Sequence, residues 1–143
     1  MLKKLLTSSF LGTVGMTLFS WGMSVSKKEK FLEPLVLNQL LYPASKKRQA
    51  HHPAGYVLHW LVGLLFSVFY CWRYRPGRFS LVKSSLVGLL NGLVGVAGWQ
   101  LTLTLHPKPP RLKLKPYYLQ LLAAHTIFGL LNGLVCRLLQ NKR

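Results

Sequence analysis

Long apolar segments separated by short basic ones are the dominant pattern of this chain. Four apolar segments stand out, at residues 5–23, 54–72, 81–105 and 118–139. A helix needs about 20 residues to cross the hydrocarbon core of a bilayer, and each segment is about that long. Because backbone polar groups cannot be left unpaired in lipid, each segment is expected to be a helix. The pattern predicts an all-α protein, a membrane-spanning four-helix bundle forming a single integral membrane domain over residues 1–143.

A shorter helix is expected between the first two segments, at residues 33–42, which read EPLVLNQLLY. Glu33-Pro34 is a typical helix start, because proline is tolerated at the first helical position. The helix is too short to span a membrane. We expect it to lie at the lipid headgroups as an interfacial helix, or to cap the bundle.

The other connections predict how the segments are arranged. Pro76-Gly77 is a turn signal, so the second and third segments should be antiparallel neighbours. The connection at residues 106–116 is rich in proline, and we expect it to be extended and stiff rather than helical. Residues 5–23 follow two lysines, as in a signal peptide. They are long for one and lack an Ala-x-Ala cleavage site, so we expect a retained helix.

The charge of the chain is strongly one-sided, with 19 Lys and Arg against two acidic residues and a net charge of +17. In a soluble protein this would suggest nucleic acid. Here the bases form clusters that flank the apolar segments, which favours anionic headgroups. The aromatic residues lie within the apolar segments, so no nucleic-acid partner is expected. Both loop sides carry similar numbers of bases, and the bases nearest the helix ends favour cytoplasmic termini.

One heptapeptide, GLLNGLV, occurs twice, at residues 88–94 and 129–135. Small residues four apart with an amide between them favour close helix packing in lipid. Asn91 and Asn132 are predicted to lie at similar depths, and we expect them to approach each other or another polar group. The helix-packing residues predicted on this basis are Gly88, Asn91, Gly92, Gly129, Asn132 and Gly133.

Three histidines near segment ends are the candidate cofactor-binding residues: His59, His106 and His125. Imidazole ligates zinc, copper and haem iron. However, no His-x-x-x-His pair occurs, and no acid lies within an apolar segment to complete a ligand set or carry protons. No Cys-x-x-Cys motif, phosphate loop or Ser/His/Asp arrangement is found. We therefore expect no catalytic residue, no metal and no cofactor, and the chain is not predicted to be an enzyme.

Several stretches together resemble a known group of proteins: GTVGMTLFSW, HWLVGLLFSVFYCW, GLLNGLVGVAGW with LHPKPP, and AAHTIFGLLNGL. They are similar in plan to small bacterial inner-membrane proteins of the YagU-like family, in short versions associated with Bacteroidetes-type bacteria. The chain is shorter and more basic than YagU-like members. The resemblance implies a four-helix integral membrane protein and carries no catalytic residues.

The expected function is a non-enzymatic packing, partner-binding or accessory role in a bacterial inner membrane, which the chain would cross several times. The expected partners are the lipid bilayer with its anionic headgroups, and a second copy of the chain or another membrane protein. Two alternatives remain open. One is a redox protein whose histidines ligate haem or a metal, and the other is a small transporter that acts as an oligomer.

Overall fold

The structure, a computed structural model, describes residues 2–73 and 80–139. Within these residues it contains helices and no strands, so the all-α prediction is confirmed. The predicted Pro76-Gly77 turn lies outside the described residues. The helices, in chain order, are α1 (Leu2–Lys27), α2 (Glu33–Leu41), α3 (Lys46–His51), α4 (Ala54–Arg73), α5 (Leu81–Leu105) and α6 (Leu114–Leu138).

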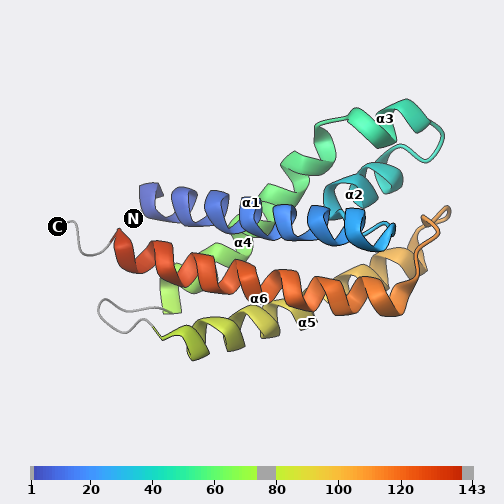
Figure 1. Cartoon of the computed structure of the whole chain (residues 1–143). Helices are drawn as coiled ribbons and strands as arrows, with labels where there is room; N and C mark the ends of the chain where they lie inside the picture. Colours follow the sequence, from blue (N-terminus) through green and yellow to red (C-terminus); the bar gives the residue numbers. More distant parts are fainter. Residues whose placement is uncertain (1, 74–79, 140–143) are drawn as a thin grey trace.

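Four long helices form the body of the molecule, and the two short ones lie at one end (Figure 1). Helix α6 packs along both α1 and α5, while α4 packs on α1 and α2. The first residues of α1 and the last of α6 lie at one end of the bundle. Helices α2 and α3 and the start of α6 lie at the other end (Figure 1).

Helix α6 begins earlier than the prolines of the preceding connection suggested. It starts at Leu114 with Lys113 as its N-cap, so Pro116 lies in its first turn. The expectation that residues 106–116 are entirely non-helical was therefore wrong for the last residues. Proline is tolerated there because the N–H groups of a first helical turn have no intrahelical partner. Helix α3 was not predicted, and its N-cap Ser45 accepts a hydrogen bond from Arg48 N at 3.4 Å.

Two of the described helices, α5 and α6, are long and apolar enough to cross a membrane. The apolar part of α4, Ala54–Tyr70, is shorter than the roughly 20 residues that a span typically needs. Helix α1 is long enough, but Ser, Thr and Gly are interspersed along it and lower its hydropathy. By length and composition the structure thus supports two spans of the four that the sequence pattern predicts.

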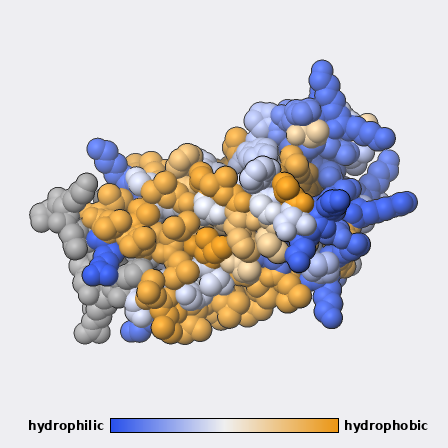
Figure 2. Space-filling model, viewed as in Figure 1, coloured by the Kyte–Doolittle hydropathy of each residue, from blue (hydrophilic) through white to orange (hydrophobic). Residues whose placement is uncertain are grey.

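The bundle buries many polar side chains and exposes many large apolar ones. Polar side chains such as Ser20, Ser67 and Asn132 are completely buried, whereas Leu65 on α4 and Leu105 on α5 are more than 70% exposed. Figure 2 shows an apolar band along one face of the bundle body, with hydrophilic residues gathered at its ends. Exposed apolar patches of this extent are rare on soluble monomers and mark a surface that contacts lipid or protein.

The two GLLNGLV segments meet through their glycines. A Cβ atom added at Gly129 of α6 would lie 2.7 Å from Gly88 Cα and 2.5 Å from the Ser84 carbonyl oxygen of α5. Gly92 lies against Leu122 and His125 in the same way. Small residues therefore let the backbones of α5 and α6 approach closely. Of the other predicted packing residues, Asn91, Asn132 and Gly133 are all buried.

Within the described residues, the side chains of Asn91 and Asn132 do not form a hydrogen bond with each other. Asn132 accepts a hydrogen bond from Ser67 Oγ of α4 at 2.8 Å and donates to the Phe128 carbonyl oxygen at 3.2 Å. The side-chain nitrogen of Asn91 is buried without a hydrogen-bond partner. The expectation allowed Asn132 to approach either Asn91 or another polar group. The structure shows the second case, because Asn132 bonds to Ser67 of α4.

Candidate functional site

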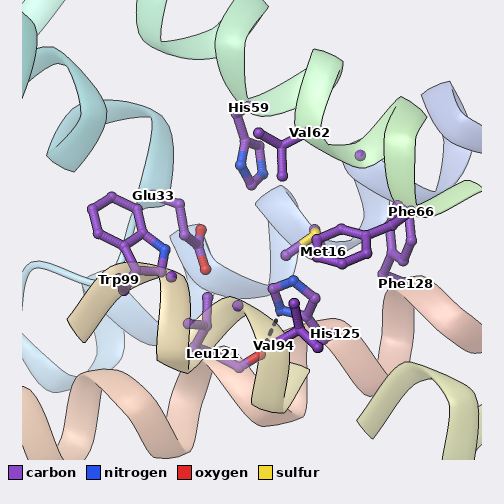
Figure 3. Close-up of a pocket in the computed structure, with 13 residues that line it drawn as sticks. Met16, Glu33, His59, Val62, Phe66, Val94, Trp99, Leu121, His125 and Phe128 are labelled. Carbon is purple, nitrogen blue, oxygen red and sulfur yellow. Dashed lines mark hydrogen bonds between the residues drawn. The ribbon is translucent and has the colours of Figure 1, made fainter. Parts of the chain in front are cut away.

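The candidate site is a chamber of about 240 Å³ inside the bundle, which receives side chains from α1, α2, α4, α5 and α6 (Figure 3). Its polar side chains are Glu33, His59 and His125. Apolar side chains make most of the remaining wall, among them Met16, Phe66, Trp99, Leu121 and Phe128. A mostly apolar cavity with a few convergent polar groups is the usual form of a small-molecule site.

Glu33, the first residue of α2, brings a carboxyl group into this chamber and is 1% exposed. Its Oε1 accepts hydrogen bonds from Ser20 Oγ at 2.9 Å and from Gln120 Nε2 at 3.2 Å. Its Oε2 is buried and has no hydrogen-bond partner. Burial raises the pKa of Glu33 from 4.5 to about 7, although its hydrogen bonds act in the opposite direction. The carboxyl group can therefore gain or lose a proton near neutral pH.

Asn38 holds α2 in the position that directs Glu33 inward. Its side-chain nitrogen donates to the His52 carbonyl oxygen at 2.7 Å, and its side-chain oxygen accepts from Gly55 N at 2.8 Å. His52 is the C-cap of α3, and Gly55 lies in the first turn of α4. A Cβ at Gly55 would collide with Asn38, so the glycine is required for this close approach. Helix α2 therefore packs against α4 with part of its surface buried, and it does not lie only at a membrane interface.

His125 of α6 is held in one orientation. Its Nδ1 lies 2.9 Å from the Leu121 carbonyl oxygen, which can only accept a hydrogen bond. Nδ1 therefore carries the hydrogen, and Nε2 of the neutral ring is an acceptor. Gly95 of α5 leaves room for the ring, because a Cβ there would lie 3.2 Å from Nε2. The rings of Phe66 and His125 form a T-shaped contact with a centroid distance of 5.7 Å.

His59 of α4 lines the same chamber as His125, whereas His106 lies elsewhere. The Nε2 atom of His59 is buried without a hydrogen-bond partner. His106 caps the end of α5, where its Nδ1 accepts from Lys108 N at 3.2 Å. Among the described residues, no group of three or more His, Cys, Asp or Glu side chains could hold a metal ion. The structure thus brings together two of the three candidate histidines.

The sequence interpretation missed Glu33 as a site residue. It considered acids only within the four apolar segments, and Glu33 lies outside all of them. Ser20 and Gln120, two of the polar residues within the apolar segments, were the available signal, because both bond to Glu33 in the structure. A buried amide or hydroxyl in a membrane-length helix needs a partner.

A second hollow, of about 320 Å³, lies where the α1–α2 and α5–α6 connections meet. Phe31 and Leu112 contribute apolar wall, and an ion pair between Lys113 and Glu29 joins the two connections. The remaining wall is basic, formed by Lys28, Lys30, Arg111 and Lys113. Such a hollow fits the expectation of anionic headgroups as neighbours.

No family model, curated protein or solved structure matches this chain.

Proposed function

We propose that this chain is a four-span integral protein of a bacterial inner membrane that binds a partner or a small ligand and is not an enzyme. The observation that carries the proposal is the combination of buried Ser, Asn, Gln and Glu side chains with an exposed apolar band (Figure 2). In water this distribution would expose apolar surface and bury polar groups, both at a cost in free energy. In lipid, exposed apolar side chains match the surrounding hydrocarbon, and polar side chains are better paired inside the bundle than exposed to it.

The spans beyond α5 and α6 are supported by packing. Helix α1 lies along α6, which is long and apolar enough to cross, and α4 in turn packs on α1. Exposed residues of α1 and α4, such as Phe10, Leu18 and Leu65, extend the apolar band. The resemblance in plan to YagU-like proteins agrees with four spans, and the basic hollow agrees with anionic headgroups at one end of the bundle.

A second candidate function, small-molecule transport, is favoured by Glu33. Transport coupled to protons generally needs an ionisable group within the membrane protein. Helix α2 supplies one, with a pKa raised to about 7 by burial. Transport would also require a second state in which the chamber opens to the other side of the membrane. Uptake of a radiolabelled ligand into proteoliposomes separates transport from binding alone, because only transport gives accumulation inside the vesicles.

Membrane retention tests the proposal. Membranes of cells that express the chain are washed at alkaline pH, which releases peripheral proteins but leaves helices that span the bilayer. The chain should remain in the pellet and be released by detergent. Release into the alkaline supernatant would contradict the proposal, because it would show that the apolar band is covered by something other than lipid.

A further inference from the structure

We propose that the chamber binds a small lipophilic ammonium ion, with its N–H groups on Glu33 and His125 and its apolar body against the aromatic wall. The inference rests on the proposed function, because it requires the chamber to be a binding site. It adds the chemical class of the ligand.

The polar atoms that face the chamber are mainly acceptors without a donor. Glu33 Oε2 is buried and unpartnered, and accepts when the carboxyl group is ionised. His125 Nε2 is an acceptor because Nδ1 donates to the Leu121 carbonyl oxygen (Figure 3). An ammonium group has up to three N–H donors and no acceptor, and so fits this set. Leaving a buried acceptor unpaired costs about 1–3 kcal/mol, so a donor that fills this gap gains affinity.

The carboxyl group also lacks a cation. No Lys or Arg lines the chamber, and the one ion pair in the described ranges joins Lys113 to the other acid, Glu29. A buried carboxylate is normally paired with an opposite charge. Trp99 lines the same chamber and adds to its apolar wall. A positive charge on the ligand would therefore supply the partner that the Glu33 carboxylate lacks.

The apolar wall indicates that the ligand arrives from the membrane. Val62 of α4 and Val94 of α5 line the chamber and are 40% and 61% exposed, so its rim belongs to the apolar band. A neutral amine dissolved in the bilayer can enter between these helices. The proton of the Glu33 carboxyl group then moves to the amine nitrogen, which leaves a carboxylate paired with an ammonium ion. No other reactant is needed.

A pair of probes of nearly equal shape tests the charge requirement: 2-phenylethylamine hydrochloride and 2-phenylethanol. Each is titrated by calorimetry into the full chain in detergent micelles at pH 7. The amine should bind at least tenfold more tightly than the alcohol. Equal affinity, or no binding of the amine, would overturn the proposal without the use of any variant.

Matched variants locate the site. Glu33→Gln removes the charge but can keep the bonds to Ser20 and Gln120, and it should weaken amine binding at least tenfold. The control Glu29→Gln removes the other acid, outside the chamber, and should bind as the parent chain does. Unchanged binding by Glu33→Gln would show that the amine binds elsewhere.

A steric pair keeps the test independent of Glu33. Gly98 lines the chamber and Gly22 does not, and a Cβ at either position would meet no atom within 4 Å. Gly98→Leu should reduce amine binding, and Gly22→Leu should leave it unchanged. If the chain is retained in alkaline-washed membranes and yet binds no amine, only the ligand assignment fails. If it is not retained, the membrane proposal itself fails.

Discussion

Ser67 of α4 donates a hydrogen bond of 2.8 Å to the side-chain oxygen of Asn132 of α6, and both residues are completely buried. This bond joins two helices that otherwise have few contacts with each other. Asn132 is in addition enclosed by α1, because Gly12 leaves the space that its amide nitrogen occupies. Asn132 is therefore the point at which three helices meet.

Removing this hydrogen bond should weaken the bundle. Ser67→Ala leaves the Asn132 side-chain oxygen unpaired, and such bonds in membrane proteins contribute about 0.6 kcal/mol on average. Unfolding in mixed micelles with increasing SDS should show a loss of roughly that size. Ser26→Ala, at an exposed position of α1, is the control and should change the free energy of unfolding by less. Equal effects of the two substitutions would contradict the assigned role.

The close approach of α5 and α6 predicts a larger effect at Gly129. Gly129→Ala would push its new methyl group into Gly88 and the Ser84 carbonyl oxygen, and overpacking costs about 1–3 kcal/mol. Gly22→Ala has open space around it and should be neutral or stabilise α1 by up to about 1 kcal/mol. The same SDS titration measures both variants. A neutral Gly129→Ala would show that the two backbones are farther apart than described.

Stability should depend on pH through Glu33. Its pKa in the folded chain is about 7, above the value of 4.5 expected when it is exposed. Between these values the folded state binds more protons than the unfolded state, so stability is greatest at low pH and falls as the pH rises to about 7. A difference of this size corresponds to a loss of up to about 3 kcal/mol.

Comparison of the free energy of unfolding at pH 5 and pH 8 measures this effect. Glu33→Gln should remove most of the dependence, because Ser20 and Gln120, which bond to the carboxyl group, have no ionisable side chain. His59 and His125 face the same chamber, and His59→Gln and His125→Gln measure any contribution from them. A pH dependence in Glu33→Gln as steep as in the parent chain would contradict the assignment.

The chamber is predicted to hold neither haem nor a metal ion. It offers two imidazoles and one carboxyl group, and one oxygen of that carboxyl group already accepts hydrogen bonds from Ser20 and Gln120. The purified protein should have no Soret band and no stoichiometric metal by elemental analysis. A Soret band that disappears in both His59→Ala and His125→Ala would instead favour the redox alternative.

The sequence predicted the helices better than it predicted their partners. Apolar length and the start at Glu33-Pro34 depend on local chemistry, and they located the elements of the bundle. The partner of Asn132 depends on the rotation of α6 about its axis, which no local pattern specifies. The inward direction of Glu33 depends on Asn38 and Gly55 holding α2 against α4, and residues so far apart in the chain give no joint signal before they are packed.

The number of spans is the central claim, and labelling from one side of the membrane tests it most directly. Single cysteines are introduced by Lys3→Cys, Ser45→Cys and Lys108→Cys in a chain whose natural cysteines are replaced. Intact spheroplasts then receive a membrane-impermeant maleimide. Four spans predict that Ser45→Cys and Lys108→Cys react from the same side, and that Lys3→Cys reacts from the other. If Ser45→Cys reacts together with Lys3→Cys and opposite Lys108→Cys, only α5 and α6 cross the membrane, and the four-span account is wrong.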